Sequence, residues 1–323
     1  MRSSLQTHVT KLLQVREIGI LIPLIIIFTI ASVFTDNFAT TANLINMGRA
    51  MSFTLIGAVG MTFILISGGL DLSVGSTLAL GGMVTGYFIA MAGLPFPLAI
   101  LLGLIATAIV GLFNGLVISK LSIPPLIVSL GMMNIARGVV NVMNRGRPYT
   151  GFPDSFNALG TMSLFGLPLS IYIAIVVVIL GHIVLKYTVF GRCITAIGGN
   201  EETARVSGIN VAKYKTINYI LMSLLAGVVG ILIAARLATS MANAGTGWEL
   251  TIIASVVIGG TSLFGGSGSI LGTVIGVAIM EVLTVAMVML RINPYWQSVV
   301  VGSIIVLAVG VDVYRRKYMS AKG

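Results

Sequence analysis

Long apolar runs separated by short polar stretches fill the chain from residue 18 to residue 313. Most runs hold about 20 residues, enough for a helix to cross the hydrocarbon core of a bilayer. Apolar residues follow one another within each run instead of alternating with polar ones, so a membrane β-barrel is excluded. The pattern predicts an all-α polytopic membrane protein with about ten transmembrane helices broken by Gly-rich segments. The predicted spans are residues 18–34, 45–67, 74–92, 96–118, 124–143, 167–185, 216–238, 250–264, 269–290 and 295–313.

Glycine pairs one helical turn apart recur within these spans. They are Gly82 and Gly86, Gly111 and Gly115, and Gly272 and Gly276. Such G-x-x-x-G spacing lets helices approach closely in lipid, where no hydrophobic force drives them together. The pairs predict tight helix packing and carry no information about function.

The composition agrees with a membrane protein. Of the 323 residues 57% are apolar and only 9% are charged, whereas a soluble domain carries about 25% charged residues. The single cysteine, Cys193, excludes an intrachain disulfide. Residues 18–34 resemble a signal peptide but lack a small-residue cleavage site and precede further spans, so we expect a retained first helix. No stretch suits a separate soluble domain, and we interpret residues 1–323 as one transmembrane domain.

The positive charges set the expected orientation. With ten spans both termini lie on one side, and most of the 19 Lys and Arg residues fall on that side. Positive charge is enriched in cytoplasmic loops, so the tails at residues 1–17 and 314–323 are predicted to be cytoplasmic. The same bias explains the net charge of +10, and we expect no nucleic-acid partner.

Two loops exceed a tight turn. Residues 144–166 are predicted to face outward and residues 186–215 to face the cytoplasm. Within the second, "GGNEETARVSGIN" predicts a short helix that begins after Asn200 as N-cap and stops near Gly208. So short a helix is marginal by itself in water. It must dock either on its own bundle or on a partner protein, and we favour a partner.

The stretch "LISGGLDLSVGS", residues 65–76, places a carboxylate at the end of an apolar run. Two interpretations remain open. Asp71 or Ser73 can cap the helix that follows, or Asp71 lines a pathway, because an ionisable group at membrane depth usually faces a cavity.

A second glycine-rich break, "GGTSLFGGSGSILG" from Gly259, echoes the first one, "GGLDLSVGSTLALG" from Gly68. The two follow the second and the eighth predicted spans and are therefore expected on the same side. Breaks of this kind are typical of discontinuous helices in transporters. Asn114 and Asn134 lie inside spans and either line a pathway or, as we favour, bond between helices. The candidates for the pathway or the helix breaks are Asp71, Ser73, Asn114, Asn134, Gly259, Gly260, Thr261 and Ser262.

Four stretches between residues 60 and 276 identify a resemblance. They are "GMTFILISGGLDLSVGS", "SLGMMNIARGVVNV", "GRCITAIGGNEETARVSGINVAKYK" and "AGTGWELTIIASVVIGGTSLFGGSGSILGTVIG". In sequence, order and spacing the chain resembles a permease subunit of the ribose-type ATP-binding-cassette (ABC) sugar importers, the family of ribose, xylose, galactofuranose and autoinducer-2 permeases. The family usually has an acidic residue after "GWEL", where this chain has Thr251, so solute contacts do not transfer directly.

The resemblance implies a type II-like ABC importer permease in a bacterial inner membrane, surrounded by lipid. An ATPase subunit would dock on the cytoplasmic loop, a periplasmic sugar-binding protein would deliver the solute, and a second permease subunit would complete the pathway. The implied coupling residues are Gly199, Asn200, Glu201, Glu202, Arg205, Ser207, Gly208 and Asn210. We further expect Arg145 and Arg147 to contact the binding protein.

The sequence gives little support for nucleotide binding, a metal site or an enzymatic activity. The chain has no G-x-x-x-x-G-K-[ST] motif, so we expect no cofactor here and ATP bound only by the partner. Neither His8 nor His182 has a cysteine or carboxylate at ligand spacing, and we expect neither an enzyme nor a metal site. The rival class is an ion-coupled secondary transporter, for which Glu281 and Asp71 are the candidate acids. We favour Glu281 facing the bundle and bonding to a neighbour.

Overall fold

The computed structural model describes residues 16–320. Most of the predicted N-terminal tail and the last three residues of the C-terminal tail lie outside this range. The described chain is mostly helical. Its helices are α2 (Arg16–Phe34), α3 (Thr41–Ile66), α4 (Val74–Ala90), α5 (Phe96–Lys120), α6 (Pro125–Met143), α7 (Asp154–Thr161), α8 (Leu169–Tyr187), α9 (Val189–Gly199), α10 (Glu201–Val206), α11 (Val211–Leu237), α12 (Trp248–Ile258), α13 (Ile270–Met289) and α14 (Pro294–Ser320).

Each predicted span overlaps one of these helices, in the order α2 to α6, α8 and α11 to α14. Six of them, α3, α5, α6, α8, α11 and α13, are both long and apolar enough to cross a membrane. The chain is therefore a multi-pass membrane protein. The other four have shorter apolar stretches, so the count of ten spans stays a prediction.

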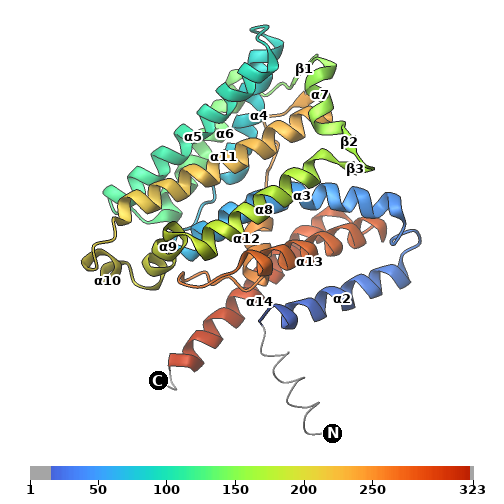
Figure 1. Cartoon of the computed structure of the whole chain (residues 1–323). Helices are drawn as coiled ribbons and strands as arrows, with labels where there is room; N and C mark the ends of the chain where they lie inside the picture. Colours follow the sequence, from blue (N-terminus) through green and yellow to red (C-terminus); the bar gives the residue numbers. More distant parts are fainter. Residues whose placement is uncertain (1–15, 321–323) are drawn as a thin grey trace.

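The ends of the bundle carry the shorter elements. The long helices run roughly side by side, with α7 and the small strands at one end and α9 and α10 at the opposite end (Figure 1). Strand β1 (Tyr149–Thr150) pairs antiparallel with β4 (Thr239–Ser240), and β2 (Ser163–Leu164) pairs with β3 (Leu167–Pro168). The first pairing joins the 144–166 loop to the segment that precedes α12.

Close glycine contacts hold the bundle together, as the G-x-x-x-G pairs predict. A Cβ atom at Gly115 of α5 would lie 2.6 Å from the Thr216 Cα of α11, and one at Gly82 of α4 would lie 3.0 Å from the Gly230 carbonyl oxygen. Gly276 of α13 lies in the same way against Ser255 of α12. Any larger residue at these positions would force the helix backbones apart.

Two short helices are not predicted from the sequence. Helix α7 lies inside the 144–166 loop, where Phe156 is fully buried and its ring meets those of Phe152 and Phe96 at 5.3 and 6.3 Å between centroids. Helix α9 lies inside the 186–215 loop and buries Ile194 and Ile197. Both loops are therefore packed structures and not simple connections.

Candidate functional site

The connection between α3 and α4, residues 67–73, is a helix break whose polar side chains are buried in the bundle. Asp71 and Ser73 have no exposed surface. One carboxylate oxygen, Asp71 Oδ1, accepts hydrogen bonds from the Ser73 backbone N–H at 2.9 Å and from the Ser73 hydroxyl at 2.6 Å. The Asn114 amide of α5 donates to the same hydroxyl oxygen at 3.1 Å. Three of the predicted pathway residues thus form one hydrogen-bonded group.

The capping prediction for this break is wrong in its detail. Ser73 occupies the N-cap position of α4, but its side chain makes no capping hydrogen bond. Its hydroxyl donates to Asp71 instead, and Asp71 accepts from the N–H of Ser73 itself. Within residues 16–320, Asp71 Oδ2 and Asn114 Oδ1 are buried without a hydrogen-bond partner. The group therefore retains two acceptor atoms that its own chain does not satisfy.

Helix α11 fixes the same break from another side. The Tyr219 hydroxyl donates to the Leu70 carbonyl at 3.1 Å, and the Asn218 amide donates to the Phe63 carbonyl near the end of α3 at 3.3 Å. Both side chains are buried. The break is consequently held by α5 and α11 together.

The second predicted break follows α12, which ends at Ile258. Gly259 is its C-cap residue, and Gly260 has φ of 84°, a left-handed conformation that suits glycine. Thr261 and Ser262 are buried immediately beyond. The predicted span at residues 250–264 is therefore too long, because the glycines end the helix.

The two glycine-rich breaks lie at the same end of the bundle and contact each other. The Gly266 N–H donates to the Ile66 carbonyl at 2.9 Å, which joins the second break to the last turn of α3. A Cβ at Gly265 would lie 3.0 Å from both the Gly68 Cα and the Gly198 Cα of α9. The expectation that the echoing segments share one side is confirmed. Together with the end of α9 they form a glycine junction, defined here as Gly68, Gly198, Gly199, Gly265 and Gly266.

The short helix predicted in the cytoplasmic loop is present as α10, and it begins directly after the glycine junction. The Asn200 side chain accepts from the Thr203 N–H at 2.9 Å as the N-cap. Gly208 ends the turn with φ of 86°, and its N–H donates to the Arg205 carbonyl at 3.0 Å. The signals for the start and the stop of this helix are confirmed.

One face of α10 docks on its own chain. Ala204 is buried against Ile197 of α9 and Val211 of α11. Glu201 accepts from Lys215 of α11 at 2.5 Å and from Arg205 at 3.1 Å. Of the two docking alternatives, contact with the bundle is thus present.

The other face of α10 is open. Arg205 also pairs with Glu202 at 3.2 Å, and their side chains are 56% and 73% exposed. Val206, an apolar residue, is 75% exposed at the helix end. The remaining predicted coupling residues, Gly199, Ser207, Gly208 and Asn210, are also exposed. The predicted set therefore gathers on one exposed tip.

Three further predicted residues, Asn134, Arg145 and Arg147, lie away from the helix breaks and from α10. Asn134 is exposed on α6, and its amide donates to the Leu130 carbonyl of the same helix at 3.0 Å, so the interhelical bond expected for it is absent from the described chain. Arg145 and Arg147 are exposed in a turn at the end of the bundle that carries α7. Their exposure fits a contact with another protein.

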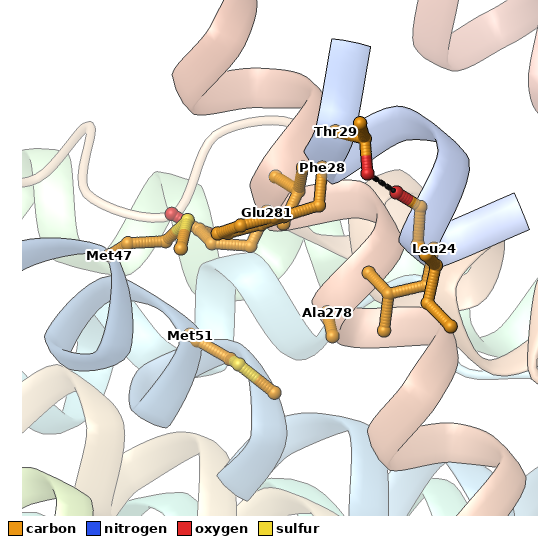
Figure 2. Close-up of a pocket in the computed structure, with 9 residues that line it drawn as sticks. Leu24, Phe28, Thr29, Met47, Met51, Ala278 and Glu281 are labelled. Carbon is orange, nitrogen blue, oxygen red and sulfur yellow. Dashed lines mark hydrogen bonds between the residues drawn. The ribbon is translucent and has the colours of Figure 1, made fainter. Parts of the chain in front are cut away.

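Glu281 occupies a pocket on the side of the bundle. Figure 2 shows it among residues of α2, α3 and α13, including Phe28, Met47 and Met51. The pocket has a volume of about 350 Å³ and is lined almost entirely by apolar groups. No hydrogen-bond or ion-pair partner for Glu281 is present among the side chains that the structure describes, so the bond to a neighbour that we favoured is absent there.

Sequence reasoning missed the segment between β4 and α12. The Arg137 guanidinium of α6 donates to the Ala242 carbonyl at 2.5 Å and to the Ala244 carbonyl at 2.9 Å. A Cβ at Gly75 of α4 would overlap the Gly245 carbonyl oxygen and the Glu249 carboxylate. The segment thus reaches the depth at which α4 begins. Its signal in the sequence is the pair of glycines in "AGTGWEL" beside a predicted span only 15 residues long (250–264).

Comparison with known proteins places the chain in a family. Residues 43–309 match the family described as the branched-chain amino acid transport system / permease component. The chain belongs to this family. It is a transport component that spans the membrane.

Curated relatives extend this assignment. The chain is 40% identical over 296 residues to the ribose import permease protein RbsC of Escherichia coli strain K12, covering 90% of this chain and 92% of the relative. It is 38% identical over 297 residues to RbsC of Haemophilus influenzae, covering 91% and 92%. It is also 38% identical over 301 residues to the L-arabinose transport system permease protein AraH of Escherichia coli strain K12, covering 93% and 92%. No solved structure matches the chain significantly.

Proposed function

We propose that this protein is the membrane-spanning permease subunit of an ABC importer for a sugar or a similar small polar solute. The observation that carries the proposal is its 38–40% identity, over about nine-tenths of the chain, to permeases named for ribose and arabinose. In this proposal the fold is of the type II-like importer class with ten spans, and the protein lies in the bacterial inner membrane with both termini cytoplasmic.

The partners follow from the same proposal. A separate ATPase subunit binds and hydrolyses ATP and docks on the exposed tip of α10, so this chain itself needs no cofactor. A periplasmic binding protein delivers the solute at the end that carries α7, where Arg145 and Arg147 are exposed. A second permease subunit, identical or related, completes the pathway within the lipid.

The architecture around α10 supports a role in coupling. Helix α10 is tied to the first turns of α11 by the Lys215–Glu201 pair, and α9 ends at the glycine junction beside the buried break. A displacement of α10 is therefore passed directly to α11 and to the turn that carries Asp71. This arrangement suits a loop on which a partner exerts force.

The test reverses charge on the exposed tip. Arg205→Glu and Glu202→Arg each remove the Arg205–Glu202 pair and place the wrong charge where the ATPase docks. In proteoliposomes with the ATPase and the binding protein, we expect sugar uptake to fall about tenfold, equivalent to roughly 1.4 kcal/mol, while ATP hydrolysis continues. The control is Lys120→Glu, which reverses an exposed charge at the end of α5.

Normal uptake in both variants would contradict the docking role of α10. The competing function is an ion-coupled secondary transporter, which the buried Asp71 carboxylate with its unpartnered Oδ2 favours. Vesicles that contain only this protein separate the two functions. We expect no accumulation of ribose or arabinose driven by a proton or sodium gradient, and accumulation without nucleotide would establish the secondary transporter.

A further inference from the structure

Helix α6 presents polar side chains to its outer surface in the middle of a membrane span. Asn134 is the tenth of its 19 residues and is exposed, as is Asn141 two turns later. Arg137 lies between them on the same face, because residues three and seven apart along a helix stack on one side. The three form a polar stripe from the centre of α6 to the end that faces the α7 side of the bundle.

Each of the two asparagines makes only one side-chain hydrogen bond within the described chain. Asn134 donates only to the Leu130 carbonyl at 3.0 Å, and Asn141 donates only to the Arg137 carbonyl at 2.8 Å. Within residues 16–320 no donor reaches the Oδ1 of either amide. The glycines of this surface, Gly131 and Gly138, have open space where a Cβ would stand. Acceptor oxygens and free volume therefore coincide on this face.

Arg137 joins the stripe to a second exposed polar segment. Its two hydrogen bonds to the Ala242 and Ala244 carbonyls fix α6 beside residues 241–247. Asn243 and Thr246 are exposed on that segment. Glu249, in the first turn of α12, follows directly after this segment. The combined surface is thus rich in hydrogen-bonding groups without a strong excess of either charge.

Lipid is a poor occupant for such a surface. Polar side chains in the hydrocarbon region are costly and in known membrane proteins face the bundle interior or a water-filled cavity. The outward faces of α5 and α8 show the contrast, with exposed Ile105, Ile109, Val176 and Ile179 at similar positions along their helices. Ile135, Val139 and Val142 are exposed beside the stripe, but the stripe itself is suited to contact with water, a solute or a polar partner surface.

We propose that Asn134, Arg137, Asn141, Asn243 and Thr246 form the solute-contact surface of this permease, suited to a neutral, polyhydroxylated solute. The inference rests on the proposed import function. Amide and hydroxyl groups bond to sugar hydroxyls as donors and as acceptors, and the Arg137 guanidinium supplies further donors. A second permease copy faces this surface and closes it from lipid, so that the site is incomplete in one chain.

The same face of α6 changes character toward its other end. Ile127 and Leu130 continue the stripe through the third of the helix nearest α9 and α10, and both are exposed. In the proposed pathway these apolar side chains line the end nearest α9 and α10, and an apolar lining that resists water is the principle of a hydrophobic gate. The polar surface thus opens toward the α7 side of the bundle, where the binding protein delivers solute in the proposed function.

Cysteine accessibility tests the surface without the ATPase. In a Cys193→Ser background, single variants Asn134→Cys, Asn141→Cys and Val176→Cys are prepared in membranes and treated with a membrane-impermeant methanethiosulfonate reagent. We expect the two α6 cysteines to react at least about tenfold faster than Val176→Cys, because thiolates form and react in water and not in lipid. Equal, slow reaction of all three would overturn the inference.

Transport measurements then decide whether the water-accessible α6 surface contacts solute. In the complex with ATPase and binding protein, Asn134→Leu and Asn141→Leu should lower ribose or arabinose uptake about three- to tenfold, as expected for one lost hydrogen bond. ATP hydrolysis stimulated by the binding protein should stay within twofold of the parent. The matched control is Thr29→Val on α2, an exposed side chain that, like Asn134, bonds only to its own helix.

Unchanged uptake in both asparagine variants would overturn the solute role even if the cysteines are accessible. Arg137 is tested separately as a positioning residue. Arg137→Lys retains one charged donor and should restore part of the uptake lost in Arg137→Gln, whereas equal loss in both would contradict a role in holding residues 241–247. Absence of ATP-driven transport in the parent protein would refute the proposed function and leave the accessibility result valid.

Discussion

Two regions of the molecule place polar groups among apolar helices, and they do so in opposite ways. At the buried break, residues 67–73, Asp71 and Ser73 are sealed by their own chain and held by α5 and α11. On α6, Asn134 and Asn141 are exposed and bond only to their own helix. The difference indicates that the first region is held mainly by contacts within the chain, whereas the second is open to something outside the chain.

This contrast has a consequence for mutagenesis. Changes at the buried break disturb several helices at once, because its hydrogen bonds and the glycine junction link α3, α4, α5, α9 and α11. Changes at Asn134 or Asn141 remove side chains that bond to no other helix of the described chain. Stability should therefore respond at the break, and transport should respond at the surface.

The largest effect is expected at the glycine junction. In Gly198→Val the new Cβ would overlap the Ile66 carbonyl oxygen and crowd the Gly266 N–H. Because backbone atoms cannot yield as side chains do, we expect a loss of about 3 kcal/mol in unfolding free energy. Thermal and denaturant unfolding in detergent measure it. Gly199→Val is the matched control, since nothing lies within 4 Å of a Cβ there, and equal loss in both variants would refute the close contact.

A smaller effect is expected from removal of the buried carboxylate. Asp71→Ala leaves the Ser73 N–H and hydroxyl without their acceptor, which should cost about 2 kcal/mol of stability. Asn134→Ala, in contrast, should change stability by no more than about 0.5 kcal/mol. The same unfolding experiment measures both. If the two variants lose similar stability, the distinction between a sealed break and an open surface fails.

The smallest effect is expected at the outer turn. Arg145→Glu with Arg147→Glu should slow capture of the sugar-loaded binding protein, since exposed pairs contribute about 0–1 kcal/mol each and act mainly on the association rate. Surface plasmon resonance at two salt concentrations measures the change, which should shrink at high salt. Capture kinetics that match the parent at low salt would contradict the predicted contact.

The sequence predicts the spans, the helix breaks and α10 because each depends on local signals. Continuous apolar runs locate the long helices, Gly259 and Gly260 end α12, and Asn200 begins α10. These signals act within one or two helical turns and need no information about neighbours. The G-x-x-x-G pairs likewise predict close packing, although not which helices meet.

The remaining features depend on contacts between distant residues. Helix α7 forms where Phe156 meets Phe96, which lies on α5, and no local pattern identifies that partner. Arg137 lies inside a predicted span (124–143), and its bonds to the 241–247 segment join residues more than 100 positions apart. The grouping of Asp71, Ser73 and Asn114 was likewise visible only in the fold, although each residue was a candidate by itself.

The glycine contacts among α4, α5 and α11 have a mechanical consequence. Gly81 lies against Gly227, Gly82 against Gly230 and Gly115 against Thr216, backbone to backbone. Because their backbones are in direct contact, the three helices cannot slide along one another. They can still tilt together as one rigid body. Since α11 starts only a few residues after α10, a displacement of α10 would tilt α4, α5 and α11 together.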